Sequence, residues 1–289
     1  MDTSTNRVFI TECPRDAMQG IKEWIPTEQK AAYINNLLTC GFDTLDFGSF
    51  VSPKAIPQMQ DTAAVLSQLD LSKSDTKLLA IVANERGAEE ALQHEEITYL
   101  GYPFSISETF QQRNTNASIE DSMKRVEFIQ NASVKHNRSL LLYLSMGFGN
   151  PYGDAWSPDL VAEWSQRLYD RFGITHLALS DTIGAANPEL VQSVFSTIIP
   201  ELPNVTVGAH LHTIREQAQA LTQAAYEGGC RHFDGAIKGY GGCPMAKDEL
   251  TGNMPTELML DWFTANNVST GIDEPAFKRA MLASSGIFH

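Results

Sequence analysis

Short apolar runs rich in β-branched and aromatic residues alternate with longer stretches of helical period from one end of the chain to the other. This alternation is typical of repeated strand–helix units and indicates a parallel sheet. The runs predict eight strands, at residues 8–11, 44–50, 78–83, 97–103, 140–146, 176–180, 205–212 and 232–236. Eight such units within 289 residues favour a closed (β/α)8 barrel, a TIM barrel of the α/β class.

The segments between the runs carry helix start and stop signals. Helices are expected to begin at Pro26-Thr27-Glu28, at Ser118, and at Ser157-Pro158-Asp159, and to end before glycines 41, 173 and 228–229. The competing fold is an open, doubly wound sheet. Such a sheet usually has a Gly-x-Gly-x-x-Gly turn after an early strand, whereas residues 13–19 contain no glycine.

No linker or low-complexity block divides the chain, so residues 1–289 are expected to form a single domain. The barrel should span about residues 7–267. Residues 268–289 should form a short C-terminal cap or helix on the barrel.

Composition narrows the functional classes. The chain has 21 Lys and Arg against 35 Asp and Glu, a net charge of −14, which argues against nucleic acid as a partner. No apolar run is long enough to cross a bilayer, and the N-terminus has no export signal, so we expect no membrane partner. The 4 cysteines form no Cys-x-x-Cys pair, which fits reduced thiols and a cytoplasmic location.

Two histidines at the end of the seventh predicted strand indicate a metal site. His210 and His212 are two residues apart, a spacing that points both imidazoles to one face of a strand. A single histidine there would more simply hydrogen-bond in the core. Asp16, after the first strand, and Asn253, after the eighth, can add oxygen ligands at the same rim of the barrel. This donor set suits Mg2+ or Mn2+ as the divalent cofactor.

Four further residues near this rim are candidate catalytic groups. Arg15 is either a surface ion-pair partner or a cation that stabilises an oxyanion. Cys243, in a glycine-rich loop, is either a proton donor or acceptor or a small apolar residue. Asp46 is either an inward carboxylate or an orienting partner, and Asp181 either a supporting acid or a helix cap.

Several segments resemble hydroxymethylglutaryl-CoA lyases in order and spacing. They are Pro14-Arg15-Asp16-Ala17-Met18-Gln19, Ser49-Phe50-Val51-Ser52-Pro53-Lys54, Ile56-Pro57-Gln58-Met59, Asp181-Thr182-Ile183-Gly184, His210-Leu211-His212, Gly241-Gly242-Cys243-Pro244 and Gly252-Asn253. The second segment is the most specific, because the arginine–aspartate and His-x-His segments also occur in isopropylmalate and citramalate synthases and in hydroxy-oxo-acid aldolases. The family commonly has Gly-Leu where this chain has Ala17-Met18, and aspartate in place of Thr213.

The resemblance implies roles for residues at the matching positions. It implies metal ligands at Asp16, His210, His212 and Asn253, and catalytic roles for Arg15, Asp16, Cys243, His210, Asp46 and Asp181. The family usually has glutamate at the position of Asp46. Gln19, Ser49, Lys54 and Arg113 are candidate substrate-binding residues, and Lys22 is a further candidate cation for the phosphates of an acyl-CoA.

The reaction that the resemblance implies is metal-dependent cleavage of 3-hydroxy-3-methylglutaryl-CoA to acetyl-CoA and acetoacetate. We expect an acyl-CoA as small-molecule partner, and a homodimer or another homo-oligomer. One alternative is a synthase that joins acetyl-CoA to a 2-oxo acid, although those enzymes typically carry a long C-terminal extension. The other is a barrel without enzymatic activity, which retention of the candidate residues argues against.

Overall fold

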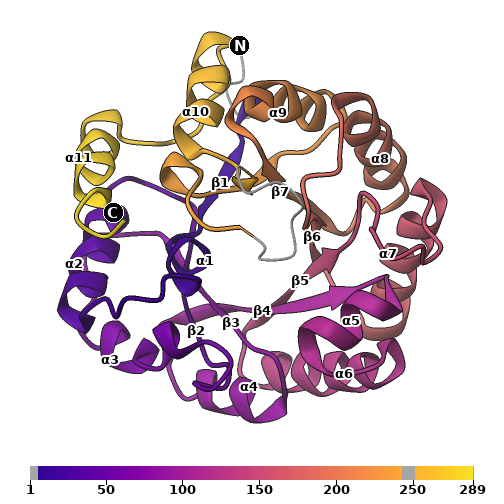
Figure 1. The fold of residues 1–289 in the computed structure, drawn as a ribbon, viewed down its shortest axis with the longest axis horizontal. Coiled ribbons are helices and arrows are strands. Elements are labelled where there is room, and N and C mark those ends of the chain that lie inside the picture. Colours follow the sequence, from indigo (N-terminus) through magenta and orange to yellow (C-terminus); the bar gives the residue numbers. More distant parts are fainter. Residues whose placement is uncertain (1–5, 243–250, 289) are drawn as a thin grey trace.

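The eight expected strands all form, and each pairs in parallel with the next along the chain (Figure 1). The structure, a computed structural model, describes residues 6–242 and 251–288. β8 pairs in parallel with β1, so the sheet closes into a barrel, as predicted. The strands are β1 (Phe9–Glu12), β2 (Thr44–Ser49), β3 (Lys77–Ile81), β4 (Ile97–Ser105), β5 (Ser139–Ser145), β6 (His176–Asp181), β7 (Thr206–Thr213) and β8 (His232–Gly235).

Helices surround the barrel, and the expected start signals act as helix caps. The Ser118 hydroxyl accepts a hydrogen bond from the Asp121 N–H, and the Ser157 hydroxyl accepts one from the Leu160 N–H. The helices between the strands are α2 (Thr27–Leu38), α3 (Thr62–Leu66), α4 (Glu85–Ala91), α5 (Glu108–Thr115), α6 (Ile119–Lys135), α7 (Pro158–Phe172), α8 (Pro188–Glu201) and α9 (Ala218–Glu227). α10 (Thr256–Ala265) follows β8, and short 3-10 turns lie at η2 (Pro57–Met59), η3 (Arg215–Gln217) and η4 (Ile237–Gly239).

The C-terminal segment forms the expected cap. α11 (Glu274–Ser284) lies beside α2 (Figure 1), and the Phe277 ring meets the Phe42 ring edge-on with centroids 6.1 Å apart. Gly41 makes this approach possible: its φ is +81°, and a Cβ there would lie 2.7 Å from the Gly271 carbonyl oxygen. Among the described helices, none is both long and apolar enough to cross a bilayer.

Alternate side chains of the strands point into the barrel or out toward the helices. Outward residues join the main core under the helices, whereas Leu79, Ile81, Tyr143 and Ala178 form a separate cluster inside the barrel. Polar side chains of the strands line the pockets above and below this cluster, such as Ser145 and His210 in one and Thr11 and Thr44 in the other. The mouth at the C-terminal ends of the strands carries the residues that the sequence singled out.

Two elements of this mouth were not expected. Residues 14–19, which follow β1 where a doubly wound sheet has its glycine-rich turn, form the short helix α1 (Pro14–Gln19), with proline in its first turn. β9 (Gly252–Asn253) pairs antiparallel with the end of β7, with Asn253 opposite His212. A strand of two residues has no periodic pattern by which the sequence could reveal it.

Candidate active site

α1 places Arg15 and Asp16 in the mouth of the barrel. The helix begins directly after β1, and both side chains are buried. The Arg15 guanidinium donates from Nε to Asp46 at 3.1 and 3.0 Å and from Nη2 to Asp46 at 2.5 Å. Its Nη1 donates to Asp16 at 3.0 Å and to the Gln19 side-chain oxygen at 2.9 Å. Arg15 is therefore a buried cation held between two carboxylates, which excludes the surface ion-pair interpretation.

Asp16 and Asp46 share the Arg15 guanidinium, but their pKa values shift in opposite directions. Burial alone would raise the pKa of Asp16, but the neighbouring Arg15 charge outweighs it and holds this pKa well below its usual range. Burial raises the pKa of Asp46 to about 6, and the attraction of Arg15 offsets this only in part. Asp16 thus stays ionised throughout the physiological pH range, as a metal-ligating carboxylate must.

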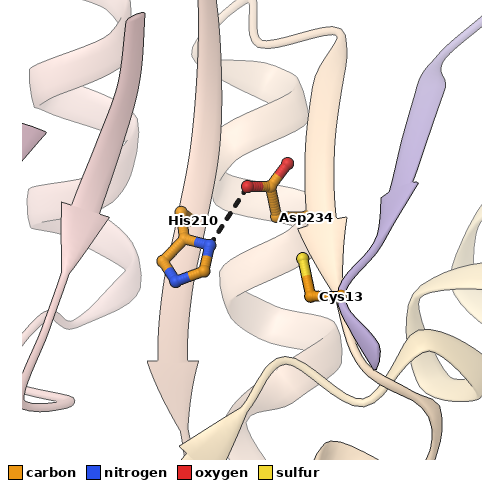
Figure 2. Close-up of side chains that lie close together, drawn as sticks. All are labelled: Cys13, His210 and Asp234. Carbon is orange, nitrogen blue, oxygen red and sulfur yellow. Dashed lines mark hydrogen bonds and ion pairs between the residues drawn. The ribbon is translucent and has the colours of Figure 1, made fainter. Parts of the chain in front are cut away.

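The two histidines of β7 lie in phase, as their spacing predicted. Their ring centroids are 5.3 Å apart. His210 Nδ1 lies 3.0 Å from an Asp234 oxygen (Figure 2), and His212 Nδ1 lies 3.0 Å from the Thr182 carbonyl oxygen. Because both partners are acceptors, each Nδ1 donates the hydrogen bond, and Nε2 of each ring is the candidate ligand atom.

The residues in this mouth fit a divalent cation. Asp16 Oδ2 and His212 Nε2 are buried, lie 3.8 Å apart, and have no hydrogen-bond partner among residues 6–242 and 251–288. Ligand atoms of Asp16, His210 and His212 all lie within 4.8 Å of one another, so these residues form a candidate metal-binding cluster. Buried polar atoms without partners are expensive, and a cation between them would satisfy both.

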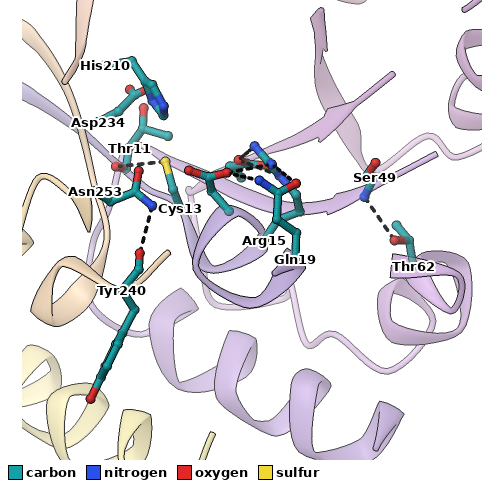
Figure 3. A network of polar contacts seen from close by, with 12 residues as sticks. Thr11, Cys13, Arg15, Gln19, Ser49, Thr62, His210, Asp234, Tyr240 and Asn253 are labelled. Atoms are coloured by element: carbon teal, nitrogen blue, oxygen red, sulfur yellow. Dashed lines mark hydrogen bonds and ion pairs between the residues drawn. The ribbon is translucent and has the colours of Figure 1, made fainter. Parts of the chain in front are cut away.

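Asn253 is positioned beside this cluster by β9. Its side-chain Nδ2 donates to the Tyr240 carbonyl oxygen at 2.8 Å (Figure 3), which leaves its Oδ1 as a ligand atom. Gly241 permits the fit, because its φ is +83° and a Cβ there would lie 2.6 Å from the Asp16 carbonyl oxygen and 2.9 Å from Asn253 Nδ2. The glycine-rich loop therefore packs against both α1 and Asn253.

A pocket of about 390 Å³ opens over the cluster. Its polar lining includes Arg15, Asp16, Gln19, His210 and His212, and its apolar walls include Val51, Ile56, Ile81, Phe110 and Tyr143. The mouth thus combines a polar reaction centre with apolar walls suited to a small organic substrate.

The other sequence candidates lie at varying distance from this pocket. Asp181 accepts backbone hydrogen bonds from Ala185 and Ala186, so it holds the turn after β6. It does not cap the following helix, because the N-cap of α8 is Asn187. The Ser49 backbone N–H donates to Thr62 Oγ1, well away from Arg15 (Figure 3). Lys54 is exposed in the loop after β2, next to pocket residues Ala55 and Ile56.

Arg113 is exposed on α5, with its guanidinium 4.8 Å from the centre of the Tyr152 ring. It does not line the pocket, although its neighbours Asn114 and Thr115 do. Lys22 is exposed beyond the end of α1. Cys243 lies outside the described residues.

Sequence reasoning missed Asp234, the residue that orients His210. Asp234 lies inside β8 and is buried, with Cys13 beside it (Figure 2). Burial would lower the pKa of His210, but its hydrogen bond to the Asp234 carboxylate and the attraction of that charge outweigh burial, so this pKa is raised. A carboxylate in the middle of a predicted barrel strand, two residues after His232 and so on the same face, was the available signal.

Fold and site together define a (β/α)8-barrel protein with a candidate metal cluster beside a buried arginine at the C-terminal ends of the strands. The chain belongs to the HMGL-like family, whose model matches residues 8–281. It is 35% identical over 270 residues to a hydroxymethylglutaryl-CoA lyase of Bacillus subtilis, covering 92% of this chain and 88% of that protein.

Of two further similar proteins, one is named for its substrates and the other has a structure with bound ligands. A 3-hydroxy-3-isohexenylglutaryl-CoA/hydroxymethylglutaryl-CoA lyase of Pseudomonas aeruginosa is 32% identical over 262 residues, covering 90% of this chain and 85% of that protein. The structure of an HMG-CoA lyase from Acinetobacter baumannii in complex with coenzyme A and 3-methylmalate superimposes with a TM-score of 0.90. The two chains are 29% identical, with 99% of this chain and 93% of the other covered.

Proposed function

We propose that this chain is a carbon–carbon lyase that cleaves 3-hydroxy-3-methylglutaryl-CoA to acetyl-CoA and acetoacetate. The observation that supports this most directly is the pair of buried ligand atoms on Asp16 and His212, next to His210 and a buried Arg15. Neither atom has a hydrogen-bond partner in the described part of the chain. Family membership and the relatives supply the reaction, and the geometry supplies groups able to perform it.

Asp16, His210, His212 and Asn253 would hold Mg2+ or Mn2+ in this site. When bound, the ion supplies a fixed chelation point and Lewis acidity for the substrate's hydroxyl and carboxylate oxygens. Asp234 and the Thr182 carbonyl hold the two imidazoles with their Nε2 atoms toward that point.

Cleavage requires a base, an anion-stabilising group and an acid. A base takes the hydroxyl proton, and Asp16, His210 and His212 are the candidates. The carbon–carbon bond then breaks, its electron pair passes to the enolate of acetyl-CoA, and the hydroxyl carbon becomes the ketone of acetoacetate. An acid returns a proton to the enolate carbon, and Cys243 is our candidate for this step.

Arg15 is suited to stabilise the enolate oxygen. Its described contacts use the N–H of Nε, both N–H groups of Nη1 and one of Nη2. The second Nη2 N–H has no protein acceptor among residues 6–242 and 251–288 and is available to substrate. Asp46 and Gln19 keep the guanidinium in place, so little reorganisation accompanies the reaction.

The experiment is an assay of the purified chain with 3-hydroxy-3-methylglutaryl-CoA and Mg2+ or Mn2+, before and after chelation. We expect equal amounts of acetoacetate and acetyl-CoA, lost on chelation and restored by the metal. His212→Gln should abolish turnover, whereas His136→Gln, at an exposed position after α6, should not. Absence of product with either metal would contradict the proposed substrate, and turnover that survives chelation would contradict the proposed metal.

Two expectations extend beyond this site. We propose that the chain works as a homodimer or another homo-oligomer, which sedimentation at working concentrations would test. We also propose a cytoplasmic location. Within the chain, Lys54, Arg113 and Lys22 are candidate contacts for the phosphates of the acyl-CoA.

A further inference from the structure

The turn that follows β8 lies against the residues that follow α11. This turn consists of η4 and Tyr240, and the Tyr240 ring is stacked on the Phe288 ring, with centroids 4.3 Å apart and planes 19° apart. In the same turn, the Lys238 ammonium donates to the Ser285 hydroxyl at 2.7 Å. Residues 285–288 therefore contact the turn at two points, one apolar and one polar.

The Phe288 side chain is itself held in place. It is 7% exposed, and it meets the Tyr33 ring of α2 edge-on, with centroids 5.9 Å apart. The Phe288 backbone N–H donates to the Ser284 carbonyl oxygen at the end of α11, at 2.9 Å. Phe288 thus joins Tyr240 to the outer helix α2 through two aromatic contacts of favourable geometry.

Tyr240 also contacts a residue of the candidate active site. Its backbone carbonyl oxygen accepts a hydrogen bond from Asn253 Nδ2 at 2.8 Å, whereas its ring points away from Asn253 (Figure 3). The two ends of an amide side chain differ, because the oxygen can bind a cation and the NH2 group cannot. A hydrogen bond that fixes Nδ2 on one side therefore fixes Oδ1 on the other, which is the orientation that a metal ligand requires.

The backbone of this turn depends on contacts from outside it. Lys238, Gly239 and Gly241 have φ values of +60°, +72° and +83°. The left-handed region is unfavourable for lysine, and glycine by itself selects no single conformation. One outside contact comes from α10, where a carboxylate accepts from the Lys238 backbone N–H at 2.8 Å. The Phe288 ring supplies another, at Tyr240.

We propose that Phe288 is a positioning residue for the candidate metal site. Stacking on the Phe288 ring holds Tyr240 so that its carbonyl fixes the Asn253 amide with Oδ1 available to the cation. Without the stack, the amide is free to turn over and present its NH2 group, which a cation repels. The proposal rests on the divalent cation of the proposed function, and it adds a residue beyond α11 to the groups that shape the site.

The first test measures the Mn2+ affinity of the purified full chain by electron paramagnetic resonance. We expect Phe288→Ala to weaken Mn2+ binding about tenfold, as loss of a group that orients a ligand does. Phe288→Tyr, which keeps the flat ring, should retain most of the affinity. Phe277→Ala is the matched control, because Phe277 is also 7% exposed but its ring meets Phe42. This control should lower the melting temperature and leave Mn2+ affinity unchanged.

The second test needs no metal. Proton–nitrogen correlation spectra of the metal-free chain report on the Asn253 side-chain NH2 group, whose signals are assigned by their loss in Asn253→Asp. We expect these signals to shift in Phe288→Ala and to stay in place in Phe277→Ala. Phe288→Leu, which keeps an apolar side chain without a flat ring, takes the place of Phe288→Ala in both tests if that variant fails to fold.

Three results would overturn the proposal. They are unchanged Mn2+ affinity in Phe288→Ala, an equal loss of affinity in Phe288→Ala and Phe277→Ala, and Asn253 signals that do not move. The equal loss would show that any weakening of the core around α11 disturbs the site. If the wild-type chain binds no Mn2+, the proposed metal fails, and the Asn253 signals still decide whether Phe288 positions Asn253.

Discussion

Asp234 decides which nitrogen His210 presents to the mouth of the barrel. Its carboxylate accepts from Nδ1 at 3.0 Å, so Nε2 remains the ligand atom. In Asp234→Asn, the amide can instead donate to Nδ1 and favour the other tautomer. We expect Mn2+ affinity to fall about 10–100-fold and kcat to fall with it.

Mn2+ binding, followed by electron paramagnetic resonance, separates this effect from a loss of activity alone. Asp70→Asn, a change of the same chemistry at an exposed position, is the control. Wild-type Mn2+ affinity in Asp234→Asn would show that Asp234 does not position His210.

Arg15 is expected to contribute both to the stability of the folded chain and to turnover. Its removal would leave the Asp46 and Asp16 carboxylates buried without their cation. We expect Arg15→Met to lower the free energy of unfolding by about 3–5 kcal/mol and turnover by orders of magnitude.

Arg15→Lys separates the two roles. A lysine keeps the charge but lacks the planar fork that contacts Asp46 and Gln19 together. In urea titrations, we expect Arg15→Lys to have most of the free energy of unfolding that Arg15→Met loses, while its turnover stays low. Normal turnover in Arg15→Lys would remove Arg15 from the reaction.

At the scale of elements, the strand–helix alternation predicted every barrel strand, with ends within two residues of those observed. Such runs carry a clear signal because strands buried on both faces are continuously apolar. α1 and β9 carry no such signal, because each is shorter than the window over which a period can be recognised. Asp16, His210 and His212 could be brought together from sequence because barrel topology alone places the ends of β1 and β7 at one mouth.

The contact between the glycine-rich loop and α1 gives a test at this scale. Gly241→Ala would place a methyl group 2.6 Å from the Asp16 carbonyl oxygen at a φ of +83°. We expect α1 and Asn253 to be pushed apart, with lower Mn2+ affinity and a loss of about 1–3 kcal/mol in stability. Gly20→Ala, at the other end of α1, is the matched control, since nothing lies within 4 Å of its Cβ. Equal effects of the two substitutions would contradict this account.

At the scale of the whole molecule, Glu12 links the first strand of the barrel to the segments that follow the eighth. Its carboxyl accepts from the Ile237 N–H at 2.7 Å and from the Thr256 hydroxyl at 2.6 Å, across the seam between β1 and β8. Burial raises the pKa of Glu12 to about 8 from an ordinary value of 4.5. Between these values the folded chain retains a proton that the unfolded chain has lost.

The free energy of unfolding must therefore fall, by up to a few kcal/mol, as the pH rises from 4.5 to about 8. Above about pH 8 the contribution of the Glu12 proton is lost completely. Glu12→Gln keeps an acceptor for the Ile237 N–H but has no proton to lose. We expect its free energy of unfolding, relative to wild type, to rise between pH 5 and pH 8 in urea titrations, whereas Glu89→Gln, at an exposed position, leaves the wild-type slope unchanged. A difference between Glu12→Gln and wild type that stays constant with pH would show that Glu12 ionises normally and that the seam is held by its carboxylate at every pH.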